Sequence, residues 1–185
     1  MEISTTLYSI IDEIGKEKIQ SDVTSDIGLS RYYIKLIFDK CEKHIDAADE
    51  ETIGTLCEAL LHFMLTVCTL PSARKIEINN IALDIVIPNL YTLKNSSDKA
   101  LVIQIAREVS DKMQAEINNI ARFQPKDKNL WLISKNPLSI RWINYTVFPG
   151  EKEIPSRERR NYSDIIVDIH KFLEETGDKS LRLFQ

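Results

Sequence analysis

Two nearly continuous apolar runs, 82–87 and 99–106, predict strands that are buried on both faces of a sheet. A preceding strand is expected from about residue 75, where isoleucines recur up to the start of the first run. One polar residue interrupts each run: Asp84 in the first and Gln104 in the second. Burying a carboxylate or an amide without partners costs on the order of a few kcal/mol. These two residues therefore mark either the floor of an active site or the remains of one.

Helices are predicted on both sides of these strands. The helix before them is apolar nearly all round after Glu58, as expected of a buried helix, and Pro71 follows it. The helix after them has an apolar stripe at helical spacing. In chain order, the expected elements outside the N-terminal region are a helix at 49–70, the three strands, a helix at 108–123, strands at 130–133 and 139–148, and a closing helix at 163–176.

The N-terminal segment predicts a small helical unit. An amphipathic helix is expected over 5–19, and the next stretch, 20–39, resembles a helix-turn-helix. Gly28 matches the glycine of the turn and can adopt positive φ, and Ser30 is placed to cap the next helix. The apolar positions of the motif are filled by Val23, Ile27, Leu29, Ile34 and Ile37.

If this motif binds DNA as such motifs usually do, residues 30–41 form the recognition helix. Basic and tyrosine side chains there are expected to contact phosphates or bases. A charged segment near residue 160 is a second candidate for phosphate contacts. The full set of candidate nucleic-acid contacts is Arg31, Tyr32, Tyr33, Lys35, Lys40, Arg157, Arg159 and Arg160. The alternative is a three-helix interaction module, because acids outnumber bases before residue 51 and acids repel phosphate.

The order helix, three strands, helix and strand is similar to the core of the PD-(D/E)xK nuclease fold. Restriction endonucleases, Holliday-junction resolvases and tRNA-splicing endonucleases share this restriction-endonuclease-like fold, and the resemblance covers about half of the chain. Gly54 and Glu58 match a glycine that is followed one turn later by an acid, and Asp84 matches the acid of the second strand. The third strand of active members carries an acid and a lysine, where this chain has Gln104 and Ala106.

Active members hydrolyse phosphodiesters with divalent metal ions, and Mg²⁺ prefers oxygen ligands. The resemblance therefore implies that Glu58, Asp84 and Gln104 are the catalytic and metal-binding residues, with Mg²⁺ as cofactor if the site is active. Lys112 is the candidate replacement for the missing lysine, as in some members. Arg107 is expected on the opposite face, since side chains alternate along a strand. The alternative is a satisfied polar cluster with no catalytic role.

Composition limits the remaining choices. The formal net charge of −4 means that any nucleic-acid surface is a local patch. No apolar run approaches the roughly 20 residues of a membrane span, and a cytoplasmic protein is expected because the N-terminus lacks a signal-peptide pattern. The three cysteines form no CxxC pair, so a zinc site is not expected. No phosphate-binding glycine motif is present, which argues against a nucleotide-driven motor or a Rossmann dehydrogenase.

Together these patterns predict an α/β (α+β) chain in two domains, a helix-turn-helix domain at 1–48 and a nuclease-like α/β domain with a C-terminal helix at 49–185. The predicted function is DNA binding, with RNA as another candidate partner, in a regulatory or accessory DNA-processing role with an inactive nuclease-like domain. Two alternatives stay open: a metal-dependent endonuclease, and an interaction module without nucleic acid. A homodimer is a further expectation, since residues 181–184 are apolar enough to mediate one.

Overall fold

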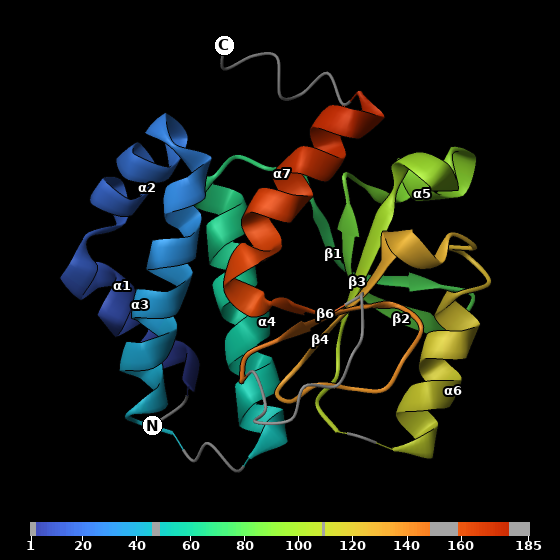
Figure 1. The fold of residues 1–185 in the computed structure, drawn as a ribbon, viewed down its shortest axis with the longest axis horizontal. Helices are drawn as coiled ribbons and strands as arrows, with labels where there is room; N and C mark the ends of the chain where they lie inside the picture. The colour runs from blue at the N-terminus through green and yellow to red at the C-terminus, as the bar shows by residue number, and fades with distance from the viewer. Residues whose placement is uncertain (1–2, 46–48, 109, 149–158, 178–185) are drawn as a thin grey trace.

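The computed structural model describes residues 3–45, 49–108, 110–148 and 159–177 (Figure 1). Within these residues, six strands form one mixed sheet in the order of the sequence. The first two pairings are antiparallel and the last three are parallel. The strands are β1 (Ala73–Ile78), β2 (Ile81–Ile87), β3 (Leu101–Ile105), β4 (Leu130–Ser134), β5 (Ile143–Thr146) and β6 (Arg159–Asn161).

Helices cover both faces of this sheet (Figure 1). One apolar core joins one face to α1, α2, α3, α4 and α7, and a second core joins the other face to α5 and α6. The α-helices are α1 (Ile3–Ile14), α2 (Lys16–Ser25), α3 (Ser30–Glu42), α4 (Glu50–Val67), α5 (Leu90–Asn95), α6 (Asp111–Ile120) and α7 (Ile165–Thr176). Short 3-10 turns are η1 (Ile27–Leu29), η2 (Ser97–Lys99), η3 (Asp127–Asn129) and η4 (Tyr162–Asp164).

The buried helix α4 lies between the N-terminal helices and the sheet (Figure 1). Its apolar residues are buried nearly all round, as the sequence predicts. The Asp49 side chain caps it by accepting a hydrogen bond from the Glu51 amide at 3.1 Å. The hydroxyl of Tyr162, in η4, donates to the Cys57 carbonyl of α4 at 2.7 Å. The chain from the far end of the sheet is therefore fixed directly to the central helix.

The predicted α/β class and the predicted central strands are confirmed. In β3, Val102 and Ile103 lie on opposite faces of the sheet, and both are fully buried. The same core contains Leu7 of α1 and Ile103 of β3, so apolar packing runs from the N-terminal helices to the sheet. The division into two domains at residue 48 stays a prediction.

Three elements differ from those expected. The single helix expected over 5–19 is broken into α1 and α2 at Gly15, whose φ of 97° lies outside the helical range. Helix α5 lies between β2 and β3, and its start is capped by Asn89, whose side chain accepts from the Thr92 amide at 2.9 Å. Strand β6 falls in the segment expected to be a charged loop, because its polar sequence carries no strand pattern.

Within the described part of the chain, none of the helices combines the length and the apolar character needed to cross a membrane. The expected cytoplasmic location stays a prediction. Residues 181–184, expected to support a dimer, lie outside the described residues.

Candidate functional site

The candidate site lies where β2 and β3 stop pairing. The last paired residues of the two strands are Ile85 and Ile103. Beyond them, side chains satisfy the backbone: the Asp84 amide donates to Gln104 Oε1 at 3.0 Å, and the Ile105 amide donates to Asp84 Oδ2 at 2.8 Å. Gln104 Nε2 also donates to the Ala82 carbonyl at 3.3 Å. The two polar residues that interrupt the apolar runs thus bridge two strands that diverge.

Glu58 of α4 contributes the second carboxylate of the site, and it is 7% exposed. Arg107 Nη2 lies 2.5 Å from Glu58 Oε2, and Arg74 Nη2 lies 3.2 Å from Glu58 Oε1. Lys75 Nζ lies 3.7 Å from the same Oε1. Each oxygen of this buried carboxylate therefore faces a guanidinium group.

Arg107 also bridges to the other acid of the site. Its Nη1 lies 3.7 Å from Asp84 Oδ1, and its Nε lies 3.8 Å from Glu51 Oε1. As side-chain alternation predicts, Arg107 lies on the face opposite Ala106: it shares the α4 side of the sheet with Ile105, while Ala106 packs in the core on the other face. Because Glu58 of α4 is on that same side, Arg107 still reaches the acids of the site.

Gly54 leaves the space that the arginine occupies. A Cβ atom at this position of α4 would lie 2.8 Å from Arg107 Cγ and 3.4 Å from Ile105 Cγ2. Glu58 follows one turn later and lies on the same side of the helix. Helix α4 therefore accommodates the stem of Arg107 at Gly54 and binds its head at Glu58.

Burial dominates the electrostatics of this cluster. Desolvation raises the pKa of Asp84 above its ordinary value of 3.8, and the hydrogen bond from Ile105 and the charge of Arg107 oppose the shift. One turn beyond Glu58, burial and then the charge of Arg74 lower the pKa of His62. His62 Nδ1 and Arg74 Nε are both buried, and neither has a hydrogen-bond partner among the residues that the structure describes.

This arrangement of donor atoms does not fit a hydrated Mg²⁺ ion. Both carboxylate oxygens of Glu58 face arginines, and Asp84 Oδ2 accepts from the Ile105 amide. The side-chain oxygen of Gln104 already accepts from the Asp84 backbone amide. Among the described residues, no three His, Cys, Asp or Glu side chains are grouped so that they could hold a metal ion. Lys112 lies in α6, but its side chain is outside what the structure describes.

Comparison with solved structures identifies the architecture. The chain superposes on metal-depleted Ecl18kI in complex with uncleaved, modified DNA with a TM-score of 0.63, 10% identity, and coverage of 96% of this chain and 80% of that one. A complex of metal-depleted Ecl18kI with uncleaved DNA gives a TM-score of 0.58, 10% identity, and coverage of 96% and 81%. The fold is restriction-endonuclease-like.

A third match covers both chains almost fully. The complex of restriction endonuclease PspGI with substrate DNA gives a TM-score of 0.59, 13% identity, and coverage of 95% of this chain and 94% of that one. No family model and no curated protein sequence matches the chain. The restriction-endonuclease-like fold is therefore shown by structure and not by sequence.

Of the candidate DNA-contacting cations of α3, Arg31 and Lys35 are exposed and Lys40 is half-buried, and each has an acidic partner in this fold. Arg31 Nε lies 2.6 Å from Asp164 Oδ1, at the junction of η4 and α7. Lys35 Nζ lies 2.9 Å from Asp39 Oδ2, and Lys40 Nζ lies 2.7 Å from Glu13 Oε1. Tyr32 is 59% exposed. The helix-turn-helix assignment of α2 and α3 stays a prediction.

Tyr33 does not lie on this exposed face, contrary to expectation. It is 3% exposed, and its hydroxyl donates to Asp22 while Lys18 Nζ lies 3.3 Å away. The residue is turned toward α2 because it follows buried Ser30 by three positions and precedes buried Ile37 by four. Tyr33 therefore joins α3 to α2 and is not available to a ligand.

The expected arginine cluster is only partly described, because Arg157 lies outside the described residues. Arg159 and Arg160 are in β6. Arg160 Nη1 lies 2.8 Å from Asp168 Oδ2, and it donates to the Tyr145 hydroxyl at 3.2 Å. Its guanidinium carbon lies 6.0 Å from the centre of the Trp131 ring. Arg160 therefore links the sheet to α7.

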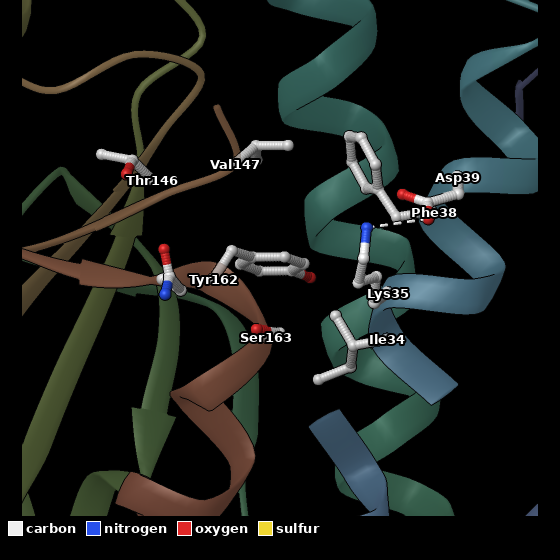
Figure 2. A pocket seen from close by; sticks show the side chains of 9 residues that line it. Ile34, Lys35, Phe38, Asp39, Thr146, Val147, Tyr162 and Ser163 are labelled. Carbon is white, nitrogen blue, oxygen red and sulfur yellow. Dashed lines mark hydrogen bonds and ion pairs between the residues drawn. The ribbon is translucent and has the colours of Figure 1, made fainter. Parts of the chain in front are cut away.

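A cavity of about 280 Å³ lies beside α3, away from the acid cluster. It is lined by α3 on one side and by β5, β6 and η4 on the other, as Figure 2 shows. Thr146 is 1% exposed, and its Oγ1 has no hydrogen-bond partner within the described part of the chain. Sequence reasoning missed this cavity because its walls come from segments more than 100 residues apart. Its lining includes Ile34, Lys35, Phe38, Thr146, Tyr162 and Ser163.

Proposed function

We propose that this chain is a DNA-binding protein that uses a restriction-endonuclease-like fold without metal-dependent cleavage, in a regulatory or accessory DNA-processing role. The observation that carries the proposal is the match over 95–96% of the chain to Ecl18kI and PspGI, both described in complex with DNA. At 10–13% identity the match concerns the fold. DNA as partner is therefore our extension from these neighbours to this chain.

Three features of the candidate site support the absence of cleavage. The third strand carries an amide at Gln104, where active members of the PD-(D/E)xK nuclease fold carry an acid. Ala106 occupies the position of their lysine, and it is 7% exposed. Arg107 stands between the two remaining carboxylates of the site. The groups that would activate water or stabilise a transition-state charge are thus missing or engaged.

The exposed cations of α3 are the proposed DNA contacts, with Tyr32 beside them. Phosphate would have to replace the carboxylate partners of Arg31 and Lys35. We therefore expect modest affinity with a steep dependence on salt, because phosphate contacts release condensed counterions. The net charge of −4 on the chain also lowers the expected affinity for DNA, because it repels phosphate.

The test is a titration of labelled duplex DNA at low and moderate salt, on the wild type and on Arg31→Ala/Lys35→Ala. The double variant should lose most of the binding, and its log K against log salt slope should be shallower by about 2. Lys171→Ala is a matched control, since Lys171 and Lys35 are both 71% exposed and both pair with an acid four residues later. Wild type that does not bind at low salt would favour the interaction-module alternative. Labelled RNA as competitor distinguishes the two nucleic acids.

A metal-dependent endonuclease is the second candidate. It is favoured by the convergence of Glu58 of α4 and Asp84 of β2 on one guanidinium. The same binding mixtures, with and without Mg²⁺, are run on a denaturing gel. Cleavage by the wild type that Glu58→Gln abolishes would establish this alternative and reject the inactive site.

A further inference from the structure

We infer that Arg107 is a built-in cation that occupies the position of a divalent metal ion between Glu58 and Asp84. The inference rests on the proposed function, because it explains how this fold keeps two acids of a nuclease-like site without catalysis. It assigns a role to Arg107, for which the sequence pattern predicted none.

The first argument is the charge balance of the cluster. Glu58 and Asp84 come from different elements, and their side chains are only 10% and 16% exposed. Two carboxylates held close together away from water repel each other and are poorly solvated unless a cation lies between them. Arg107 contacts both acids through its two Nη atoms, at 2.5 Å and 3.7 Å.

The second argument is that helix α4 has room for the arginine stem. At Gly54 any Cβ atom would lie 2.8 Å from Arg107 Cγ, so the glycine allows the stem to cross α4 in contact with the helix. The stem then leads to Glu58, one turn further along α4, where the guanidinium group binds. A glycine at this place also matches the nuclease pattern, so what is particular to this chain is the arginine stem that lies against it.

The third argument concerns the oxygens that a metal would use. Glu58 Oε2 is held by Arg107 and Oε1 by Arg74, while Asp84 Oδ2 accepts from the Ile105 amide. Asp84 Oδ1 is left, and it faces the same Arg107 guanidinium. Removing the Arg107 head group would free one oxygen on each acid, Oε2 of Glu58 and Oδ1 of Asp84.

This predicts that the wild type does not respond to divalent cations and that Arg107→Met does. Methionine keeps much of the stem that packs near Gly54 and removes the charge. Melting temperatures are measured with increasing Mn²⁺, in the absence of DNA, for the wild type, Arg107→Met and Arg107→Met/Glu58→Gln. Arg107→Met should gain about 3–6 °C at a Mn²⁺ concentration ten times its Kd. The wild type and the double variant should not shift.

Arg74→Met is the matched control, because it also removes a guanidinium from Glu58 but leaves Arg107 between the acids. It should show no Mn²⁺ response. An equal rise in the wild type, a rise in Arg74→Met as large as in Arg107→Met, or no rise in Arg107→Met would each overturn the inference. If Arg107→Met does not fold alone, circular dichroism after refolding with and without Mn²⁺ decides: recovery with Mn²⁺ supports the inference, and no recovery overturns it.

These measurements contain no DNA, so their outcome is independent of the DNA titration. If the wild type binds DNA but the melting temperature of Arg107→Met does not change with Mn²⁺, the proposed function stands and the role of Arg107 is rejected. If the wild type does not bind DNA but Mn²⁺ raises the melting temperature of Arg107→Met, DNA binding is rejected and the role of Arg107 stands.

Discussion

The Asp84 amide donates to the side-chain oxygen of Gln104 at 3.0 Å, where the backbone pairing of β2 and β3 ends. The side-chain nitrogen of Gln104, Nε2, in turn donates to the Ala82 carbonyl at 3.3 Å. A glutamate could accept the first hydrogen bond but could not donate the second while ionised. The amide at this position therefore joins two diverging strands, a role that a catalytic carboxylate would perform less well.

Gln104→Leu should lower the free energy of unfolding by about 1–3 kcal/mol. The substitution leaves the part-buried Asp84 amide without its partner, and an unpaired buried group carries a penalty of that size, whereas the exposed Ala82 carbonyl can bind water instead. The measurement is urea unfolding at neutral pH.

Gln104→Glu distinguishes the contributions of the two Gln104 hydrogen bonds, to the Asp84 amide and to the Ala82 carbonyl, to the stability of the protein. At neutral pH the carboxylate accepts from Asp84 but repels the Ala82 carbonyl, so the variant should be less stable than the wild type. In acid the protonated glutamic acid regains a donor, and the deficit should shrink. A deficit independent of pH would mean that the bond to Ala82 contributes little.

The buried carboxyl of Asp84 should make stability depend on pH. Its pKa is raised above 3.8, chiefly by burial, so between 3.8 and the raised pKa the folded protein binds more protons than the unfolded chain. Stability therefore falls as the pH rises through that window. Urea unfolding of the wild type and Asp84→Asn across this range should show the wild type losing stability relative to the variant as the pH rises. A constant difference would contradict the raised pKa.

Much of this fold could be predicted because its central strands are continuous apolar runs. Asp84 and Gln104 stood out as polar residues within those runs, and the structure brings them together. Strand β6 could not be predicted in this way, since it is short and polar and depends on pairing with β5. Tyr33 was misplaced because an aromatic residue with a hydroxyl fits both an exposed and a buried face.

Contacts between distant parts of the chain carry no periodic signal. Arg31 and Asp164 are 133 residues apart, and only the packed fold shows that they form an ion pair. Strand alternation correctly predicts that Arg107 lies on the face opposite Ala106, but it does not show which acids lie on that face. The partners of Arg107 in α4 and β2 depend on the space at Gly54, a property of two packed elements and not of either sequence alone.

Gly54→Ala should destabilise the protein, against the usual preference of helices. Alanine normally favours a helix over glycine by about 1 kcal/mol. Here its Cβ would lie 2.8 Å from Arg107 Cγ, and crowding of this kind costs about 1–3 kcal/mol. Urea unfolding should show a net loss, and the loss should be smaller when Gly54→Ala is made in an Arg107→Ala background. Greater stability of Gly54→Ala alone would show that the arginine does not need this space.

Asp164→Asn should strengthen DNA binding by releasing Arg31 of α3. The Asp164 side chain accepts from Arg31 Nε at 2.6 Å and makes no capping hydrogen bond to α7, so its charge can be removed with little harm to the helix. An exposed ion pair is worth up to about 1 kcal/mol, so the affinity for duplex DNA should rise by up to about fivefold at low salt. Glu175→Gln, which makes the same charge change on α7 beside Lys171, is the matched control.

The combination Asp164→Asn/Arg31→Ala shows whether the gain depends on the arginine. If Arg31 contacts phosphate, the combination should bind no better than Arg31→Ala. An equal gain in Asp164→Asn and Glu175→Gln would instead point to the net charge of the protein, because charge at a distance raises affinity for DNA without a specific contact. No gain in Asp164→Asn would place the DNA contacts away from this end of α3.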